Sequence, residues 1–383
     1  MTNTDKNKFT FPVGYHKFHK DQVFNFQLNR WHSLGYTRFE DMKKVGQRVT
    51  NFDDWKREMV RLAEEVLSEK RYMNAAFYYR AAEFYILEES AEKQKMYDSF
   101  SEYFYRAFKD EGIERFEVPY EKGAMPAIKL KASGKKKGTI VIHGGFDSFI
   151  EEWYSPMRYF SDHGYEAIGF EGPGQGNARR KYGLAFDYRW EKPTKAVLDY
   201  FKLDDVTLLG FSMGGWFCFR AAAFEPRIKR VIASSVAYDY IKTMNIVFQK
   251  LHILFARYLK NMSNKMILNA IKKGSGMQAW QSFQMMYITK KEIPVDAFEE
   301  MVFKMNEENL HSELVKQDVL ILTGRNDHFI PFKAHKMQVR ALTNAKSVTA
   351  KVFTKETHAN NHCQIGNTGL ALDTIVKWIE GIS

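Results

Sequence analysis

The chain has 383 residues, of which 45% are hydrophobic, and this is enough for one large core or for two domains. The formal net charge is +11. Its lysines and arginines are spread along the chain, often interleaved with acids, and no stripe of base-stacking aromatics accompanies them. Composition therefore argues against an intrinsically disordered chain and against nucleic-acid binding.

The cysteine content and the N-terminus indicate a cytoplasmic protein. Two cysteines, Cys218 and Cys363, are too few for a disulfide framework, which fits a reducing compartment. No apolar segment of signal-peptide type follows the polar start of the chain, and no run of 18 apolar residues occurs, so a membrane span is not expected. Neither a metal site nor a cofactor is expected, and a homodimer is compatible with the aromatic helices described next.

Residues 1–112 are predicted to form a helical domain. Apolar side chains recur at helical spacing in 52–70, 73–87 and 91–108, and Asp53 and Asp54 occupy positions suited to an N-cap and a first turn. Small alanines that alternate with large aromatics predict closely packed antiparallel helices. The aromatics are explained first by helix packing, and a wall of a substrate site is the alternative.

Residues 113–383 are predicted to form a second domain in which strands alternate with helices. Short runs of β-forming residues occur at 115–120, 127–132, 139–142, 165–170, 206–209, 231–234, 319–324 and 347–353. Helical patterns fall between them at 153–163, 194–201 and 216–224, and another closes the chain at 373–379. This alternation predicts a mostly parallel sheet with helices on both faces.

One stretch at about 240–317 interrupts the alternation with a helical, methionine-rich and aromatic pattern. Gly274, Ser275 and Gly276 predict a break within it. Such an insertion can form a lid over a site, or its flexible methionines can fill a gap in the core, and the pattern alone leaves both interpretations open.

The sequence Gly-Phe-Ser-Met-Gly at 210–214 carries the strongest chemical signal. It follows a predicted strand, opens into an Ala-rich helix and has the pattern G-x-S-x-G, in which small flanking residues permit a strained turn with an exposed serine. Ser212 is therefore the candidate nucleophile, with an ordinary strand-to-helix turn as the alternative.

A serine nucleophile needs a base and an acid, which in this type of sheet follow it in the chain at later strand ends. Asp327 follows the strand at 319–324 and is the candidate acid, with a turn-capping role as the alternative. Two histidines, His358 and His362, lie after the last strand, and position alone does not choose between them. Their spacing of four also suits a metal pair, but no nearby carboxylate completes such a site.

An oxyanion hole is predicted from backbone N–H groups of Met213 and of the loop containing Gly145 and Phe146, where glycine lets the backbone approach the substrate. Asp239, which follows the strand at 231–234, is a further candidate for substrate contact. The segment 172–176 lacks the lysine and the spacing of a phosphate-binding loop, so it is interpreted as a tight turn at the border of the site.

Five motifs together resemble the α/β-hydrolase superfamily. More narrowly they are similar to the branch with a helical N-terminal domain that includes 2,6-dihydroxypseudooxynicotine hydrolase and the fungal pigment chain-shortening hydrolases. The motifs are Gly144-Gly145-Phe146-Asp147-Ser148, Glu171-Gly172-Pro173-Gly174-Gln175-Gly176, Gly210-Phe211-Ser212-Met213-Gly214-Gly215, Asp327-His328-Phe329-Ile330-Pro331 and His362-Cys363-Gln364.

The likeness runs from about Phe52 to the C-terminus and implies four things. The helical domain covers the catalytic face, and the chemistry is hydrolysis of an ester or of a carbon–carbon bond next to a ketone. The catalytic histidine is His362, because the family's histidine is followed by cysteine. Glu171 stands where the family's motif usually has aspartate, and it is a further candidate for substrate contact.

These observations predict a serine hydrolase that acts on a small, aromatic or apolar substrate. Attack by Ser212 is compatible with an ester, an amide or a ketone-activated carbon–carbon bond, since each reaction passes through an oxyanion. An amide- or peptide-directed hydrolase and a catalytically silent binding protein with this fold are the alternatives.

Overall fold

Helices occupy the chain before its first strand in the computed structural model, which describes residues 9–274 and 276–382. In order they are α1 (Gln22–Ser33), α2 (Phe39–Gly46), α3 (Phe52–Ser68), α4 (Tyr72–Phe84) and α5 (Ala91–Ala107). The last three match the expected helices to within a few residues. Helix α3 is capped by Asn51, whose side chain accepts a hydrogen bond from the Asp54 N–H, so Asp53 and Asp54 both lie in the first turn.

Eight strands form one sheet, in the order β1-β2-β4-β3-β5-β6-β7-β8. Their bounds are β1 (Glu114–Tyr120), β2 (Gly123–Leu130), β3 (Gly138–His143), β4 (Tyr165–Phe170), β5 (Val206–Phe211), β6 (Ile228–Ser234), β7 (Asp318–Gly324) and β8 (Ser347–Phe353). The β1–β2 and β2–β4 pairs are antiparallel and all others are parallel. The prediction of a mostly parallel sheet is confirmed.

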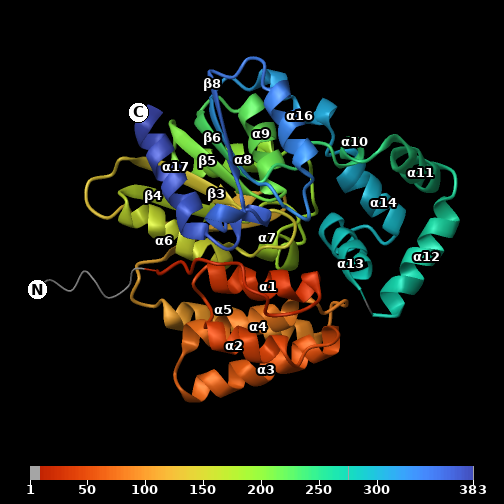
Figure 1. Cartoon of the computed structure of the whole chain (residues 1–383). Coiled ribbons are helices and arrows are strands. Elements are labelled where there is room, and N and C mark those ends of the chain that lie inside the picture. The colour runs from red at the N-terminus through yellow and green to blue at the C-terminus, as the bar shows by residue number, and fades with distance from the viewer. Residues whose placement is uncertain (1–8, 275, 383) are drawn as a thin grey trace, which may run out of the picture.

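The sheet is buried on both faces, as Figure 1 shows from the helices on either side of it. Neighbouring residues of one strand point to different cores: Ile140 and Ile142 pack with α6 (Tyr154–Asp162) and α17 (Thr368–Ile382), whereas Val141 packs on the other side. That second core holds residues of α8 (Glu191–Phe201), α9 (Gly214–Phe224) and α16 (Phe332–Ala341). Burial of both faces explains why the central strands are continuous apolar runs.

The N-terminal helices share a core with one face of the sheet. Trp55, Phe77 and Phe100 belong to the same apolar cluster as Ile142 and Phe160. The expected domain division at Gly112 falls between the end of α5 and the start of β1. We retain it as a proposed boundary in the sequence, although packing continues across it.

The stretch between β6 and β7 is helical, as expected for about 240–317. It comprises α10 (Tyr240–Thr243), α11 (Ile246–Arg257), α12 (Lys260–Lys272), α13 (Met277–Thr289), α14 (Pro294–Phe298), a π-helical turn (Glu299–Phe303) and α15 (Glu307–Leu310). Of the expected break, Gly274 and Gly276 lie between α12 and α13, and Ser275 lies outside the described residues. No helix in residues 9–274 and 276–382 has the length and apolar character needed to cross a membrane.

Candidate active site

Ser212 lies at the sharp turn between β5 and α9. Its φ of 60° is in the left-handed region, which a non-glycine residue rarely adopts, and its N–H donates to the Ser234 carbonyl at 2.8 Å. A Cβ on Gly210 would lie 2.1 Å from the Gly214 carbonyl oxygen, and a Cβ on Gly214 would lie 2.7 Å from that of Gly144. The turn therefore requires both flanking glycines, as the G-x-S-x-G pattern predicts.

His362 and Asp327 complete a hydrogen-bonded chain with the serine. The Ser212 hydroxyl donates to His362 Nε2 at 2.8 Å, and His362 Nδ1 donates to Asp327 Oδ2 at 2.8 Å. Asp327 follows β7 and His362 follows β8, so the carboxyl ends of neighbouring strands bring the three side chains together. His358 is exposed and has no contact with Ser212. This geometry is that of a nucleophile, a base and an orienting acid.

The Asp327 carboxylate is held by four hydrogen bonds. Oδ1 accepts the N–H groups of Phe329 and Ile330, both at 2.9 Å, and Oδ2 accepts the Ser235 hydroxyl at 2.9 Å in addition to His362. Burial alone raises the pKa of this carboxyl, but the adjacent His362 and the hydrogen bonds outweigh burial and hold the pKa below its usual value. Asp327 is therefore ionised when it orients the histidine.

His362 is buried, and burial alone lowers its pKa, but the charge of Asp327, together with Cys363 and their hydrogen bonds, raises the pKa well above 6.5. Because the base must be neutral to accept the serine proton, we expect kcat/KM to rise with pH as His362 loses its proton, with a midpoint above 6.5. The measurement is kcat/KM for a p-nitrophenyl ester across pH. In Asp327→Asn the midpoint should move down, because the largest raising influence is gone. An unchanged midpoint in Asp327→Asn would contradict this assignment.

The loop after β3 lies directly against the nucleophile turn. A Cβ on Gly145 would lie 2.8 Å from the Met213 backbone nitrogen. The Gln175 side chain fixes this loop, because Nε2 donates to the carbonyl oxygens of Gly144 and Gly145 at 2.9 Å each. The backbone N–H groups of Phe146 and Met213 form no hydrogen bond within the described residues. They are free to donate to an oxyanion.

Replacing Gly145 by alanine should disable this arrangement. The new Cβ would also meet the Phe211 carbonyl oxygen at 2.9 Å, so the loop must move away from the Met213 amide. Loss of one oxyanion donor lowers kcat by roughly 100- to 1,000-fold, and we expect a loss of that size with folding retained by circular dichroism. Gly138→Ala is the matched control, since its Cβ meets only the Tyr165 ring at 3.7 Å. Equal losses in the two variants would contradict the assignment.

The structure does not bring Glu171 to the site. This buried carboxyl accepts the Ile150 N–H at 3.0 Å and the Asn177 N–H at 2.6 Å, and it does not line the cavity. Burial and the neighbouring Glu151 raise its pKa to about 8. Glu171 therefore ties the start of α7 (Gly176–Arg180) to the 3₁₀ turn at Ile150–Trp153, which precedes α6, and substrate contact by Glu171 stays a prediction.

Asp239 also differs from its expected role. It is the N-cap of α10, where Oδ1 accepts the Lys242 N–H at 2.9 Å, and its Oδ2 accepts the Glu307 N–H at 3.3 Å. Its neighbours Ala237 and Tyr240 line the cavity, whereas Asp239 does not. The carboxylate therefore stabilises the entry into the helical insertion, and substrate contact by Asp239 stays a prediction.

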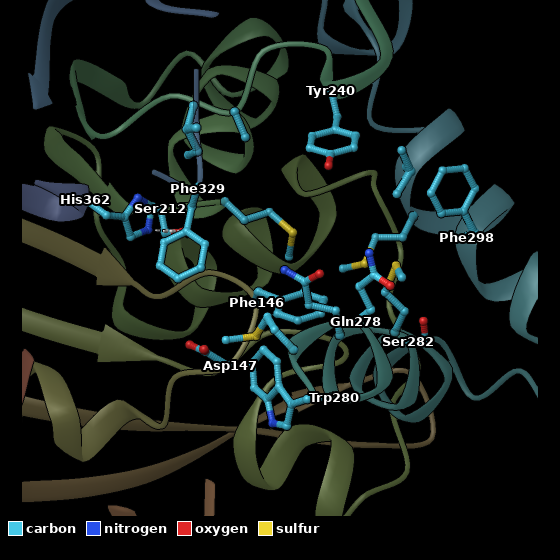
Figure 2. A pocket seen from close by; sticks show the side chains of 18 of the residues that line it. Phe146, Asp147, Ser212, Tyr240, Gln278, Trp280, Ser282, Phe298, Phe329 and His362 are labelled. Atoms are coloured by element: carbon cyan, nitrogen blue, oxygen red, sulfur yellow. Dashed lines mark hydrogen bonds between the residues drawn. The ribbon is translucent and has the colours of Figure 1, made fainter. Parts of the chain in front are cut away.

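A cavity of about 880 Å³ opens beside Ser212 and His362 (Figure 2). Most of its walls are apolar, from the insertion, the nucleophile turn and helix α1; they include Phe26, Phe146, Met213, Phe248, Phe255, Met266, Met277, Trp280, Met285, Phe298, Met301, Met305 and Phe329. Polar side chains also line the cavity, and Asp147, Gln278 and Ser282 are among those labelled in Figure 2. The residues that the structure describes contain no His, Cys, Asp and Glu group suited to a metal ion.

The matches with known proteins agree with this geometry. A family described as "alpha/beta hydrolase fold" matches residues 139–360, which is more than half of the chain. This chain belongs to the α/β-hydrolase fold family.

Similar proteins carry hydrolase names. Hydrolase acrC of Aspergillus aculeatus is 31% identical over 211 residues, which cover 46% of this α/β-hydrolase chain and 48% of acrC. Alpha/beta hydrolase ucsC of Acremonium sp is 26% identical over 283 residues, covering 61% of this chain and 57% of ucsC. The chain thus matches about half of the length of these relatives. The family and these names support a hydrolase enzyme.

Solved structures share the fold over nearly the whole chain. The crystal structure of 2,6-dihydroxy-pseudo-oxynicotine hydrolase is 20% identical with a TM-score of 0.65, covering 91% of this α/β-hydrolase chain and 94% of the other. The structure of AbyA5 is 18% identical with a TM-score of 0.66, covering 90% of each chain. The resemblance found in the sequence motifs is confirmed at the level of the fold.

Helix α1 contributes residues to the cavity of this α/β-hydrolase that the sequence analysis missed. Phe26, Gln27 and Arg30 line it, and the Phe26 ring centroid lies 6.0 Å from that of His362. Gln27 is buried, and its Oε1 accepts no hydrogen bond within the described residues. A buried acceptor without a partner on the cavity wall is available to a donor group of a ligand.

Two arginines of the N-terminal helices hold the loop that follows the glycine pair. Arg80 donates to the Asp147 carbonyl oxygen at 2.5 Å and to the fully buried Glu152 at 2.7 Å. Arg30 pairs with Glu152 and lies 3.4 Å from the Asp147 carboxylate. Figure 1 shows these helices packed beneath the sheet domain. The helices therefore both wall the cavity and position the loop that faces Ser212.

Proposed function

We propose that this protein is a serine hydrolase that cleaves an ester or a ketone-activated carbon–carbon bond of a small apolar or aromatic substrate. The observation that carries the proposal is the hydrogen-bonded chain Ser212–His362–Asp327 at the wall of a large apolar cavity. Hydrogen bonds of 2.8 Å at both steps are short enough for proton transfer without rearrangement.

The proposed reaction has two halves. His362 Nε2 takes the Ser212 proton as Oγ attacks the carbonyl carbon, and the N–H groups of Met213 and Phe146 stabilise the oxyanion. As the bond breaks, protonated His362 delivers its proton to the leaving alcohol or to the leaving enolate of a ketone. Water, deprotonated by His362, then attacks the acyl-enzyme, which releases a carboxylic acid and restores Ser212. The net change is addition of one water across the broken bond.

The cavity supports the proposed substrate class. Its volume of about 880 Å³ lies within the range of pockets that bind a single small molecule, and its methionine and aromatic walls favour apolar rings or chains. Cleavage of a carbon–carbon bond needs a ketone oxygen in the leaving fragment as well as the attacked carbonyl, because the leaving group is an enolate. Gln27 and Asp147, which line the cavity, could hydrogen-bond polar groups of that kind.

The alternatives are less well supported. A catalytically silent binding protein would have no need for a strained serine with both hydrogen-bond partners in place. A peptide-directed hydrolase needs polar groups that pair with the substrate backbone, and the mainly apolar walls provide few. Cytoplasmic location and homodimer formation remain predictions.

A fluorophosphonate probe tests the proposal, because it phosphonylates an activated serine. We expect labelling of the wild-type protein at Ser212 and none in Ser212→Ala. Ser282→Ala is the control, since Ser282 lines the same cavity without a histidine partner, and it should label like the wild type. A panel of aromatic and aliphatic p-nitrophenyl esters, peptides and β-diketones then defines the scissile bond. Failure of folded wild-type protein to label would overturn the proposal and favour the binding protein.

A further inference from the structure

The helical insertion has an unusual charge balance. Residues 240–291 include no aspartate or glutamate and nine basic residues, namely Lys242, Lys250, Arg257, Lys260, Lys265, Lys272, Lys273, Lys290 and Lys291. Only Lys242, with Glu307, and Lys260, with Asp296, form ion pairs within the described residues. Two shorter acid-free stretches, 122–146 and 328–355, carry six basic residues each. The insertion therefore carries a concentrated positive field with few internal counter-charges.

The same segment holds most of the exposed large apolar side chains. Within the described residues, eleven of the eighteen lie between Tyr240 and Leu268. Val247 and Leu254 of α11, and Tyr258 at its C-cap, are 61%, 44% and 76% exposed. These spacings of seven and four place the three on one face of the helix. A monomeric soluble surface rarely gathers apolar groups in this way without a partner.

Helix α12, which contacts α11, carries exposed apolar and basic residues of its own. Lys265, Leu268 and Lys272 are exposed and follow each other at spacings of three and four. In Figure 1, α11 and α12 form the outer edge of the molecule, with α13 and α14 between them and the sheet domain. The α11–α12 face is thus defined by Val247, Lys250, Leu254, Tyr258, Lys265, Leu268 and Lys272, and nothing in the described structure covers it.

We propose that the α11–α12 face docks on an anionic lipid surface. An anionic lipid surface binds proteins through two kinds of side chain. Apolar side chains enter the boundary of the acyl chains, and flanking lysines contact lipid phosphates or carboxylates. A second copy of this chain would place like charges against each other. Nucleic acid would match the charge but leave the apolar stripe without a partner. The charge and the apolar groups together therefore favour the lipid surface.

Docking there would place the cavity next to the lipid. The inner sides of the same helices line the cavity through Phe248, Phe255 and Ile267. Helices α11 and α12 thus carry both cavity-lining residues and the residues of the α11–α12 face, and Figure 1 shows these two helices beyond α13 and α14, away from the sheet domain. The docked protein would meet amphipathic or membrane-dissolved compounds at the cavity wall.

Vesicle binding of the full-length protein tests the proposal. We expect it to float with vesicles of phosphatidylcholine plus phosphatidylserine, to bind vesicles of phosphatidylcholine alone far less, and to weaken as salt is raised. Each basic residue at an anionic surface contributes about 1 kcal/mol, so the triple variant K250Q/K265Q/K272Q should lose on the order of 100-fold in affinity. K43Q/K44Q/K95Q is the matched control, because these exposed lysines of α2 and α5 form no ion pair in the described structure.

A second variant separates the apolar contribution. V247S/L254S/Y258S should bind more weakly than the wild type, and the binding that remains should be abolished by salt. None of the six positions lines the cavity, so hydrolysis of a water-soluble ester and fluorophosphonate labelling should stay at wild-type levels in both triple variants. This readout keeps failure of lipid binding distinct from failure of the proposed chemistry.

Two outcomes would overturn the proposal. One is equal binding of the wild type and K250Q/K265Q/K272Q to the anionic vesicles. The other outcome combines two results: light scattering shows a wild-type dimer that dissociates in V247S/L254S/Y258S, and the wild type does not float with vesicles. Together these results would assign the face to contact with a second copy of the chain.

Discussion

Ser212→Ala should lower kcat by on the order of 10⁶-fold for whichever substrate the wild type hydrolyses, because removal of the nucleophile of a triad has an effect of that size. The substitution removes only the hydroxyl, and alanine must still adopt the backbone conformation that the Ser212 N–H bond to Ser234 enforces at the turn. We therefore expect a folded protein with an intact cavity and little change in substrate affinity. Steady-state kinetics together with isothermal titration of a bound substrate separate the two quantities.

The residual rate is informative in its own right. Triad knockouts retain roughly 10³- to 10⁴-fold acceleration over water through the oxyanion hole and binding. Ser212→Ala combined with Gly145→Ala should fall below Ser212→Ala alone, because the second change acts on the oxyanion donors. A Ser212→Ala protein that retains a tenth of wild-type kcat would show that the reaction does not use this serine.

His362→Ala should cause a loss of similar size, again on the order of 10⁶-fold in kcat. Without the imidazole the Ser212 hydroxyl has no base, and Asp327 loses the partner that lies 2.8 Å from its Oδ2. Because the Asp327 carboxylate would still accept three hydrogen bonds, from Phe329, Ile330 and Ser235, we expect the fold to survive. Thermal unfolding monitored by circular dichroism provides that check.

His358→Ala is the matched control, since it removes an imidazole from the same loop four residues away. His358 is exposed, so kcat should remain within about twofold of the wild type, as is usual for a surface substitution. A large loss in His358→Ala with a small one in His362→Ala would reverse the assignment of the base.

The sequence was sufficient to place the candidate catalytic residues at strand ends. Ser212 and Asp327 each follow an apolar run long enough to be a buried strand, and both carry local patterns whose physical demands the structure meets, such as the Gly210 and Gly214 contacts. The choice of His362 over His358 did not follow from position. It came from the resemblance to relatives with a His-Cys pair, and the structure brings His362 to Ser212.

Helix α1 shows why part of the site was missed. Ten of its twelve residues are buried, among them Asn25, Gln27, Asn29 and Arg30, because the helix lies between the catalytic face and the other N-terminal helices. From the sequence, its polar residues are expected to face solvent, but in the structure they are buried. No amphipathic stripe marks such a helix.

The positions of Glu171 and Asp239 away from the cavity lining have a different cause. Glu171 and Asp239 both lie near strand ends close to the nucleophile, where a carboxylate can face a ligand or satisfy backbone N–H groups. The choice between these two roles depends on which backbone N–H groups come near the carboxylate, and the local sequence does not specify this. The N–H groups belong to residues 150 and 177 for Glu171, and to residues 242 and 307 for Asp239.

The pairing of Arg30 and Arg80 with Glu152 limits how this enzyme can be divided. Glu152 is fully buried, and both of its arginine partners come from the other side of the Gly112 boundary. Leaving one buried charge unpaired costs about 3–5 kcal/mol, a large part of the stability of an ordinary domain. A fragment that starts at residue 113 would carry this carboxylate without either partner. Engineering that exchanges the helical part between relatives therefore has to transfer the Arg-Arg-Glu set as a unit.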